Sequence, residues 1–221
     1  MKRHEAASPY YPILLNIQGK KCLVVGGGEV ALRKAQMLLE HDAIVEIVSP
    51  AFCPELNQLA KDGAIRAIHK AYKTEHLNDA LLVVAATDDA KVNEKVAAEA
   101  RKMGVLVNVV DKLDISDFIV PSYFRHGDII VAVSTSGKSP ALARKIRGEL
   151  ERDFKAEYAQ LAVIASEVRS ELKQRGITVS GDDWQEVLNL NSLIELIKRG
   201  KNKEAREIML TRLKTPGQRK L

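Results

Sequence analysis

The stretch that decides the fold of this chain is Lys20-Lys21-Cys22-Leu23-Val24-Val25-Gly26-Gly27-Gly28-Glu29-Val30-Ala31-Leu32-Arg33-Lys34-Ala35. An apolar run, a glycine turn and an amphipathic helix follow one another, which is typical of a site that holds a dinucleotide pyrophosphate. Gly26 allows a sharp turn, Gly28 lets backbone N–H groups approach phosphates, and Ala31 keeps the helix close to the sheet. A purely structural turn is the alternative. The candidate cofactor-binding residues of this motif are Gly26, Gly27, Gly28, Glu29, Val30 and Ala31.

Strands and helices alternate along the residues that follow. Apolar runs predict strands at 43–50, 63–68, 81–89 and 105–110, and periodicity predicts helices at 55–61 and 90–103. This alternation predicts a Rossmann-like, doubly wound parallel sheet of the α/β class, whose ligands bind beyond the carboxyl ends of the strands. We therefore expect Thr87, Asp88 and Asp111 to converge with the glycine turn on one crevice. Ser49, at the end of the second strand, is a further candidate cofactor-binding residue.

The pattern changes after Asp117. Residues 118–124 and 129–134 predict a β-hairpin whose turn includes His126. Ser139 as N-cap and Pro140 at the first helical position predict the start of a helix. A small all-helical region follows, with helices expected near 183–190, 191–199 and 203–213 and with Tyr158 and Trp184 in its core. The expected domains are 1–115, 116–150 and 151–221.

Composition excludes several classes of protein. Of 221 residues, 46% are hydrophobic and 29% charged, as in ordinary globular proteins, and no apolar run is long enough to predict a membrane span. The two cysteines and the lack of zinc-binding spacings predict neither a disulfide framework nor a metal site. The net charge of +5 suits a polyanionic small molecule as well as nucleic acid, and no nucleic-acid-binding motif accompanies it. We expect a cytoplasmic protein that binds neither membrane nor nucleic acid.

Four blocks carry a resemblance to a known family. They are Gly26–Lys34, Ala85–Asp89, Asn108–Asp111, and the run from Phe118-Ile119-Val120-Pro121-Ser122 through to Ala132–Arg147. In this order they resemble the precorrin-2 dehydrogenases of sirohaem biosynthesis, some of which are also sirohydrochlorin ferrochelatases. The last block is the most specific, because a generic nucleotide-binding domain has no need of it. The resemblance implies the amino-terminal module of a sirohaem synthase: an NAD-binding domain, a hairpin dimerisation region and a small helical domain, assembled as a homodimer.

The resemblance also implies a reaction, in which precorrin-2, a tetrapyrrole, loses a hydride to NAD⁺ and a proton to its surroundings and becomes sirohydrochlorin. The position that matches the catalytic aspartate of the family is Asp111, for which a helix-capping or loop role is the alternative. The carboxylates of the substrate account for the polar and basic residues after the hairpin. The candidate substrate-binding residues are Ser134, Thr135, Ser136, Gly137, Lys138, Arg144 and Arg147.

Some alternatives stay open at the level of sequence. The residues do not decide whether Fe²⁺ is a second substrate, because proton removal during metal insertion needs only one carboxylate. A domain that senses NAD(H) and regulates a partner is the alternative function, although a sensor needs no anion-binding block such as 134–147. The resemblance implies NAD as the cofactor, although the second strand ends at Ser49-Pro50 without the acid that usually binds the adenine ribose of NAD. No arginine adjoins Ser49, so the sequence does not favour NADP either. Glu46 is acidic but is expected within that strand.

Overall fold

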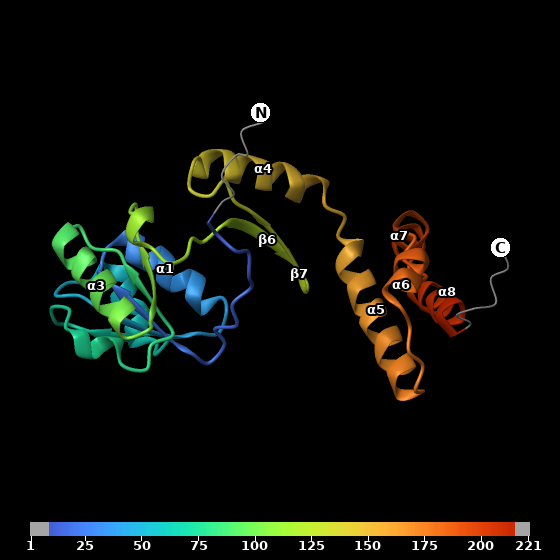
Figure 1. Ribbon diagram of the computed structural model, residues 1–221, viewed down its shortest axis with the longest axis horizontal. Coiled ribbons are helices and arrows are strands. Elements are labelled where there is room, and N and C mark those ends of the chain that lie inside the picture. The colour runs from blue at the N-terminus through green and yellow to red at the C-terminus, as the bar shows by residue number, and fades with distance from the viewer. Residues whose placement is uncertain (1–8, 215–221) are drawn as a thin grey trace, which may run out of the picture. The chain divides into compact units, whose positions relative to one another are not determined.

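The computed structural model describes residues 9–214, which form two compact units divided between Val120 and Pro121. The first unit contains a five-stranded parallel sheet with the strand order β3-β2-β1-β4-β5 (Figure 1). The strands are β1 (Lys21–Val25), β2 (Ile44–Val48), β3 (Arg66–Ile68), β4 (Leu82–Ala85) and β5 (Leu106–Val109). The helices are α1 (Glu29–Leu39), α2 (Pro54–Lys61) and α3 (Ala90–Lys102), with two 3₁₀ turns, η1 (Thr74–Leu77) and η2 (Leu113–Ile115).

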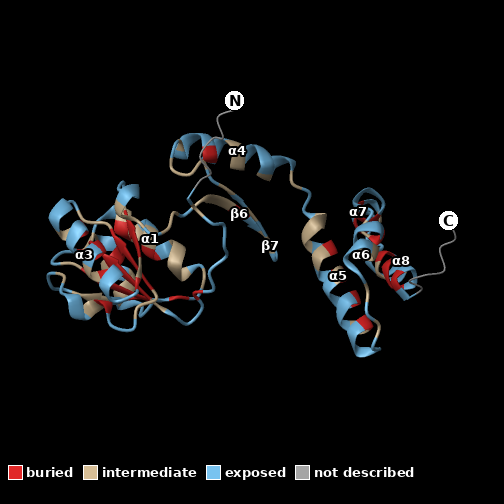
Figure 2. Cartoon of the chain, in the orientation of Figure 1, coloured by how far each residue is buried: buried red, intermediate tan, exposed pale blue. Residues whose placement is uncertain are grey.

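Helices cover both faces of this sheet. Successive side chains of a strand point to opposite faces, and in β1 Cys22 and Val24 pack with the helices α1 and α2. Leu23 and Val25 pack on the other side, with α3. Apart from their first residues, β1, β2, β4 and β5 are buried, as Figure 2 shows, which is why their sequence is mostly apolar, whereas β3 at the edge of the sheet is exposed or half-buried. The doubly wound Rossmann-like fold expected from the sequence is confirmed.

The second unit begins with an antiparallel hairpin of β6 (Ser122–His126) and β7 (Ile129–Val133). The expected hairpin is confirmed, but its first strand begins at Ser122 instead of Phe118, directly after Pro121, which has no N–H for a strand ladder. Gly127, with φ +57°, and Asp128 form the two-residue loop. The helix α4 (Pro140–Asp153) packs on the hairpin. Ser139 caps it as predicted, accepting a hydrogen bond from the Leu142 N–H at 3.2 Å.

The expectation that His126 lies in the turn is wrong. His126 is the last residue of β6, and its ring stacks on Phe154 with a centroid distance of 5.4 Å. Phe124 meets both rings edge-on. His126 pairs with Ile129 of β7, so the strand reaches the two-residue loop, whereas the adjacent glycine pointed to a turn in the sequence.

The second unit continues in a helical bundle formed by α5 (Glu157–Gln174), α6 (Gly181–Val187), α7 (Leu190–Lys198) and α8 (Asn202–Lys214). One apolar cluster, which includes Leu161, Val168, Leu193 and Met209, joins the four helices. Trp184 packs at its margin. Among residues 9–214, no helix combines the length and the apolar character that crossing a membrane requires.

Candidate nucleotide-binding site

Four strands of the first unit end level with one another. The register pairs Val25 of β1 with Val48 of β2 and with Ala85 of β4, and it pairs Ala85 with Val109 of β5. Hydrogen bonds continue just past these ends, from Gly26 N–H to Val48 C=O at 3.0 Å and from Ala86 N–H to Val25 C=O at 2.8 Å. The residues that follow the four strands therefore share one edge of the sheet. This is where open parallel sheets bind their ligands.

Two of the three glycines at this edge are required by packing. Gly26 has φ +129°, a conformation that disfavours side chains, and a Cβ there would lie 2.2 Å from the Ala86 carbonyl oxygen. A Cβ on Gly27 would lie 1.8 Å from the Ala51 carbonyl oxygen. The Gly27 carbonyl also accepts a hydrogen bond from the Cys53 N–H at 2.8 Å. Both glycines let the chains after β1, β2 and β4 approach one another.

Gly28 differs from its two neighbours, because a Cβ there would have no atom within 4 Å. It is exposed and is the N-cap residue of α1, and no side chain caps this helix. The first N–H groups of a helix have no partner within it and carry partial positive charge. Glu29, Val30 and Ala31 form the first turn of α1; Glu29 and Val30 lie beside the open space at Gly28, whereas Ala31 is buried against the sheet. Backbone donors next to open space suit a phosphate group.

Thr87 and Asp88 follow β4. Thr87 is held by Asn93 of α3, which is 8% exposed: the Thr87 hydroxyl donates to Asn93 Oδ1 at 2.8 Å, and Asn93 Nδ2 donates to the Thr87 carbonyl at 2.8 Å. Asp88 is exposed, and Asp89 caps α3 by accepting from the Lys91 N–H at 2.8 Å. Sequence reasoning missed Asn93. The available signal in the sequence was an asparagine at the helical spacing of the apolar residues Val96, Ala97 and Ala100.

Asp111 lies two residues beyond the end of β5 and is exposed. Its φ of +59° is uncommon for a residue with a side chain, although aspartate tolerates it better than most. Its carboxylate makes no hydrogen bond within residues 9–214, and the N-cap of the following 3₁₀ turn is Lys112. The helix-capping alternative for Asp111 therefore has no support in this geometry.

The segment after Asp111 is hydrogen-bonded along β5. The Asp117 N–H donates to the Val107 carbonyl at 2.7 Å, and the Asp117 carboxylate accepts from the Val107 N–H at 3.1 Å. Ser116 Oγ accepts from the Val109 N–H at 2.9 Å, and Asn108 Nδ2 donates to the Phe118 carbonyl at 2.9 Å. These contacts provide hydrogen-bond partners for the backbone groups at the outer edge of β5, and they hold the loop that carries Asp111.

Lys34 of α1 is electrostatically coupled to Asp111. Burial lowers the pKa of Lys34 and the neighbouring Arg33 lowers it further, while the Asp111 carboxylate acts in the opposite direction. The net pKa lies below the ordinary value for lysine. Sequence reasoning treated Lys34 only as part of the glycine block, since nothing in the sequence relates it to Asp111.

Ser49 and Glu46 define the end of β2. Ser49 is half-buried, and its N–H donates to the Ile68 carbonyl at 3.1 Å. Glu46 lies within β2 as expected and is 7% exposed, paired with Lys21 at 3.1 Å and with Arg66 at 2.8 Å. Burial acts to raise the pKa of Glu46, but the hydrogen bonds from Lys21 and Arg66 outweigh it and leave this pKa below its ordinary value. The carboxylate of Glu46 thus forms ion pairs with two cations.

The predicted substrate-binding residues belong to the second unit, in the loop after β7 and in α4. Ser134 Oγ accepts from the Ser136 N–H at 3.0 Å, and Thr135 Oγ1 accepts from the Ser139 N–H at 2.9 Å. Ser136 and Gly137 have positive φ values of +53° and +81°. The loop 134–138 is therefore a tight turn stabilised by its own side chains.

The cations of this region differ in exposure. Lys138 and Arg144 are exposed and form no ion pair within the described residues. Arg147 is half-buried and is paired with Glu151 one helical turn later. Its Nε is buried without a hydrogen-bond partner in the part of the chain described. Lys138 and Arg144 are thus better placed than Arg147 to meet an external anion.

Comparisons with known proteins agree with this geometry. Residues 13–122 match a family model described as NAD(P)-binding, and residues 127–153 match the model "Sirohaem biosynthesis protein central". The chain is 40% identical over 203 residues to a sirohaem synthase of Nitrosomonas europaea, covering 90% of this chain and 42% of that protein. It is 42% identical over 198 residues to a sirohaem synthase of Nitrosococcus oceani, covering 89% of this chain and 42% of that protein. The chain thus spans about two fifths of the length of these relatives.

A solved structure, that of SirC, a precorrin-2 dehydrogenase, matches with a TM-score of 0.66 and 26% identity, over 93% of this chain and 99% of SirC. The fold and the glycine turn thus define a nucleotide-binding protein of the NAD(P) class, with a sirohaem-biosynthesis region after its parallel sheet. The chain is similar to the sirohaem synthases over about two fifths of their length, and to a precorrin-2 dehydrogenase over nearly the whole of that protein. The resemblance stated from its sequence is confirmed.

Proposed function

We propose that this protein oxidises precorrin-2 to sirohydrochlorin with NAD⁺ as hydride acceptor. The observation that carries the proposal is the uncapped N-terminus of α1 at the sheet edge that also bears Asp111. Phosphate donors and a carboxylate at one edge suit a dehydrogenase. The similarity to SirC supports this reaction class, and the match to the sirohaem biosynthesis model supports a tetrapyrrole substrate.

The backbone N–H groups of Gly28, Glu29 and Val30 would hold the pyrophosphate, and Gly26 and Gly27 shape the turn that presents them. Thr87, fixed by Asn93, and Asp88 would line the same crevice at the end of β4. NAD⁺ supplies the acceptor for the hydride. The substrate must then lose a proton, for which the exposed Asp111 carboxylate is the proposed base. The positive φ of Asp111 fits a residue held in place for function.

NAD is proposed over NADP on the basis of the chain after β2. Ser49, Pro50 and Ala51 carry no cation that would pair with a 2′-phosphate. Ser49 would contact the adenine ribose through its hydroxyl. Glu46 does not serve this purpose, because Lys21 and Arg66 engage its carboxylate. Titration of the protein with both cofactors tests the preference, and tighter binding of NADP⁺ would contradict it.

The tetrapyrrole carboxylates are proposed to bind at the loop 134–138 and at Arg144, with Arg147 supporting the helix through Glu151. The hairpin is the proposed dimer interface. Its strand β7 alternates between half-buried and exposed residues, and Ile130 is 39% exposed. A two-stranded hairpin with an exposed apolar edge favours pairing with a second copy. A monomeric mass by light scattering at micromolar concentration would refute the homodimer. A cytoplasmic location is proposed with this function, in keeping with two unpaired cysteines.

The decisive experiment is anaerobic incubation of the protein with precorrin-2, with and without NAD⁺. We expect the absorbance spectrum of sirohydrochlorin to develop only when NAD⁺ is present, together with stoichiometric NADH. Oxidation at equal rates without NAD⁺, or NAD⁺ binding with no oxidation, would contradict the proposal. Adding Fe²⁺ after oxidation is complete tests iron insertion separately.

A further inference from the structure

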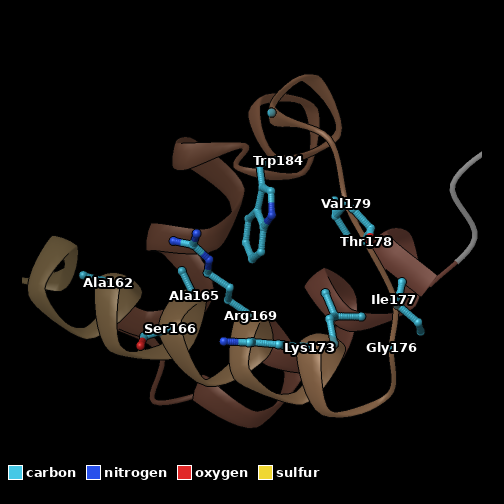
Figure 3. A pocket seen from close by; sticks show the side chains of 12 residues that line it. Ala162, Ala165, Ser166, Arg169, Lys173, Gly176, Ile177, Thr178, Val179 and Trp184 are labelled. Carbon is cyan, nitrogen blue, oxygen red and sulfur yellow. The ribbon is translucent and has the colours of Figure 1, made fainter.

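The helical bundle of the second unit contains a cavity with a volume of about 870 Å³. One wall is formed by α5, and the other is formed by the connection 176–181 and by Trp184 of α6 (Figure 3). Cavities that bind small molecules measure roughly 300–1,000 Å³, so this one is large enough for a sizeable ligand. None of its lining residues belongs to the predicted cofactor or substrate residues.

Two cations line this cavity without a counter-ion. Arg169 and Lys173 stand four residues apart on α5, and Figure 3 shows their side chains on the side of the helix that faces Trp184. Neither side chain forms an ion pair or a hydrogen bond within residues 9–214. Like charges at this spacing repel one another across a helical turn. Nothing in the described bundle compensates this repulsion.

Several other cations of the bundle are paired with carboxylates. Arg175, Arg206 and Lys214 all pair with Glu171 of α5. The bundle thus contains carboxylates that neutralise cations, and these lie outside the cavity. Arg169 and Lys173 line the cavity and have no such partner within residues 9–214, so their charges are available to an external anion.

Trp184 gives the cavity a flat aromatic wall. The side chain is half-buried, packing against the apolar cluster of the bundle while it also lines the cavity. Aromatic faces stack on planar rings in offset geometry. An indole face opposite two cations is complementary to a planar ring system that carries negative charges.

We propose that this cavity binds a planar, aromatic ligand with at least two carboxylate or phosphate charges. The ring would stack on Trp184, and Arg169 and Lys173 would each bind one anionic group. A carboxylated tetrapyrrole and a nucleotide both have this chemistry. The inference goes beyond the proposed function, because it concerns side chains of α5 and α6 alone.

Trp184 is the single tryptophan of the chain, so its fluorescence reports on this cavity directly. The full-length protein is titrated with uroporphyrin, a carboxylated porphyrin, in one arm and with NAD⁺ in the other, with absorbance corrections. The probe that saturates the quenching at the lower concentration shows whether the cavity prefers a carboxylated tetrapyrrole or a nucleotide. We expect saturable quenching in at least one arm.

The double variant Arg169→Gln, Lys173→Gln separates binding here from binding elsewhere. We expect its half-saturation concentration to rise by about tenfold or more, since it loses charge-assisted contacts. Lys203→Gln, Arg212→Gln is the matched control: it removes two exposed charges from α8 and should behave like the parent. The single variant Lys173→Gln, expected to show an intermediate shift, serves if the double variant does not fold.

Two results would overturn the inference: no saturable quenching by either ligand, or quenching that is the same in the parent and in the folded Arg169→Gln, Lys173→Gln protein. The second result means that the ligand quenches Trp184 from another site. Oxidation of precorrin-2 is measured separately on the same proteins. If the parent protein shows the expected quenching pattern but does not oxidise precorrin-2, the proposed function is refuted and the ligand-binding inference stands.

Discussion

Replacing Gly28 with aspartate tests the nucleotide site most sharply, because the change should spare the fold and remove binding. A Cβ at this position meets no atom within 4 Å, and its φ of −91° and ψ of −172° suit an aspartate as N-cap. Aspartate is preferred over glycine at N-caps by only a few tenths of a kcal/mol. We therefore expect Gly28→Asp to melt at or slightly above the temperature of the parent.

The effect on binding follows from the new charge. A carboxylate about 4 Å from a pyrophosphate oxygen is repelled by about 1 kcal/mol at the dielectric constant of water and by about 4 kcal/mol at an effective value of about 20. Since Gly28 is exposed, the effect should lie between these limits. NAD⁺ binding should then weaken by about fivefold to about a thousandfold. Isothermal titration calorimetry measures the dissociation constant, and a thermal melt checks the fold.

Two further variants are informative. The first separates the effect of the added charge from the effect of the added side-chain volume, and the second separates loss of binding from loss of stability. Gly28→Asn has nearly the same shape without the charge and should bind NAD⁺ more tightly than Gly28→Asp. Gly27→Ala places a Cβ 1.8 Å from the Ala51 carbonyl oxygen and should destabilise the protein by about 1–3 kcal/mol. A folded Gly28→Asp protein that binds NAD⁺ as tightly as the parent would refute the assignment of the glycine turn to the cofactor.

Three other predictions follow from the same edge of the sheet and its core. Asp111→Asn should lower the rate of precorrin-2 oxidation by a factor of about 10²–10⁴ while NAD⁺ affinity and melting temperature stay unchanged, and a near-parental rate would make Asp111 a structural residue. Asn93→Ala removes the buried partner of Thr87 and should lower the free energy of unfolding by about 1–3 kcal/mol in urea titrations, whereas an unchanged midpoint would contradict its role. Glu46 has a lowered pKa in the folded state, so its ionisation stabilises the protein above its ordinary pKa of 4.5, and this stabilisation is lost as the pH falls through the lower folded value. Glu46→Gln should therefore lose less stability than the parent on acidification below 4.5, and parallel curves for both proteins would disprove this linkage.

Local patterns in the sequence were sufficient for the order of the elements. Continuous apolar runs predicted the parallel strands, because strands buried on both faces tolerate no polar position other than a paired one such as Glu46. Ser139 and Pro140 predicted the start of α4, since capping depends on residues adjacent in the chain. The two 3₁₀ turns were not predicted, because such short segments carry no hydrophobic periodicity.

The sequence by itself determined that a glycine turn joins an apolar strand to a helix, and hence the class of ligand expected there. Only the tertiary structure decided which glycine serves which purpose: Gly26 and Gly27 accommodate the carbonyls of Ala86 and Ala51, and Gly28 borders open space. Asn93 beneath Thr87, and the coupling of Lys34 to Asp111, likewise join residues that meet only when the sheet has formed. The physical reason is the distance along the chain over which each interaction acts. Turn, cap and strand preferences arise from neighbours along the chain, whereas steric fit, buried hydrogen bonds and electrostatic coupling depend on atoms that folding brings together.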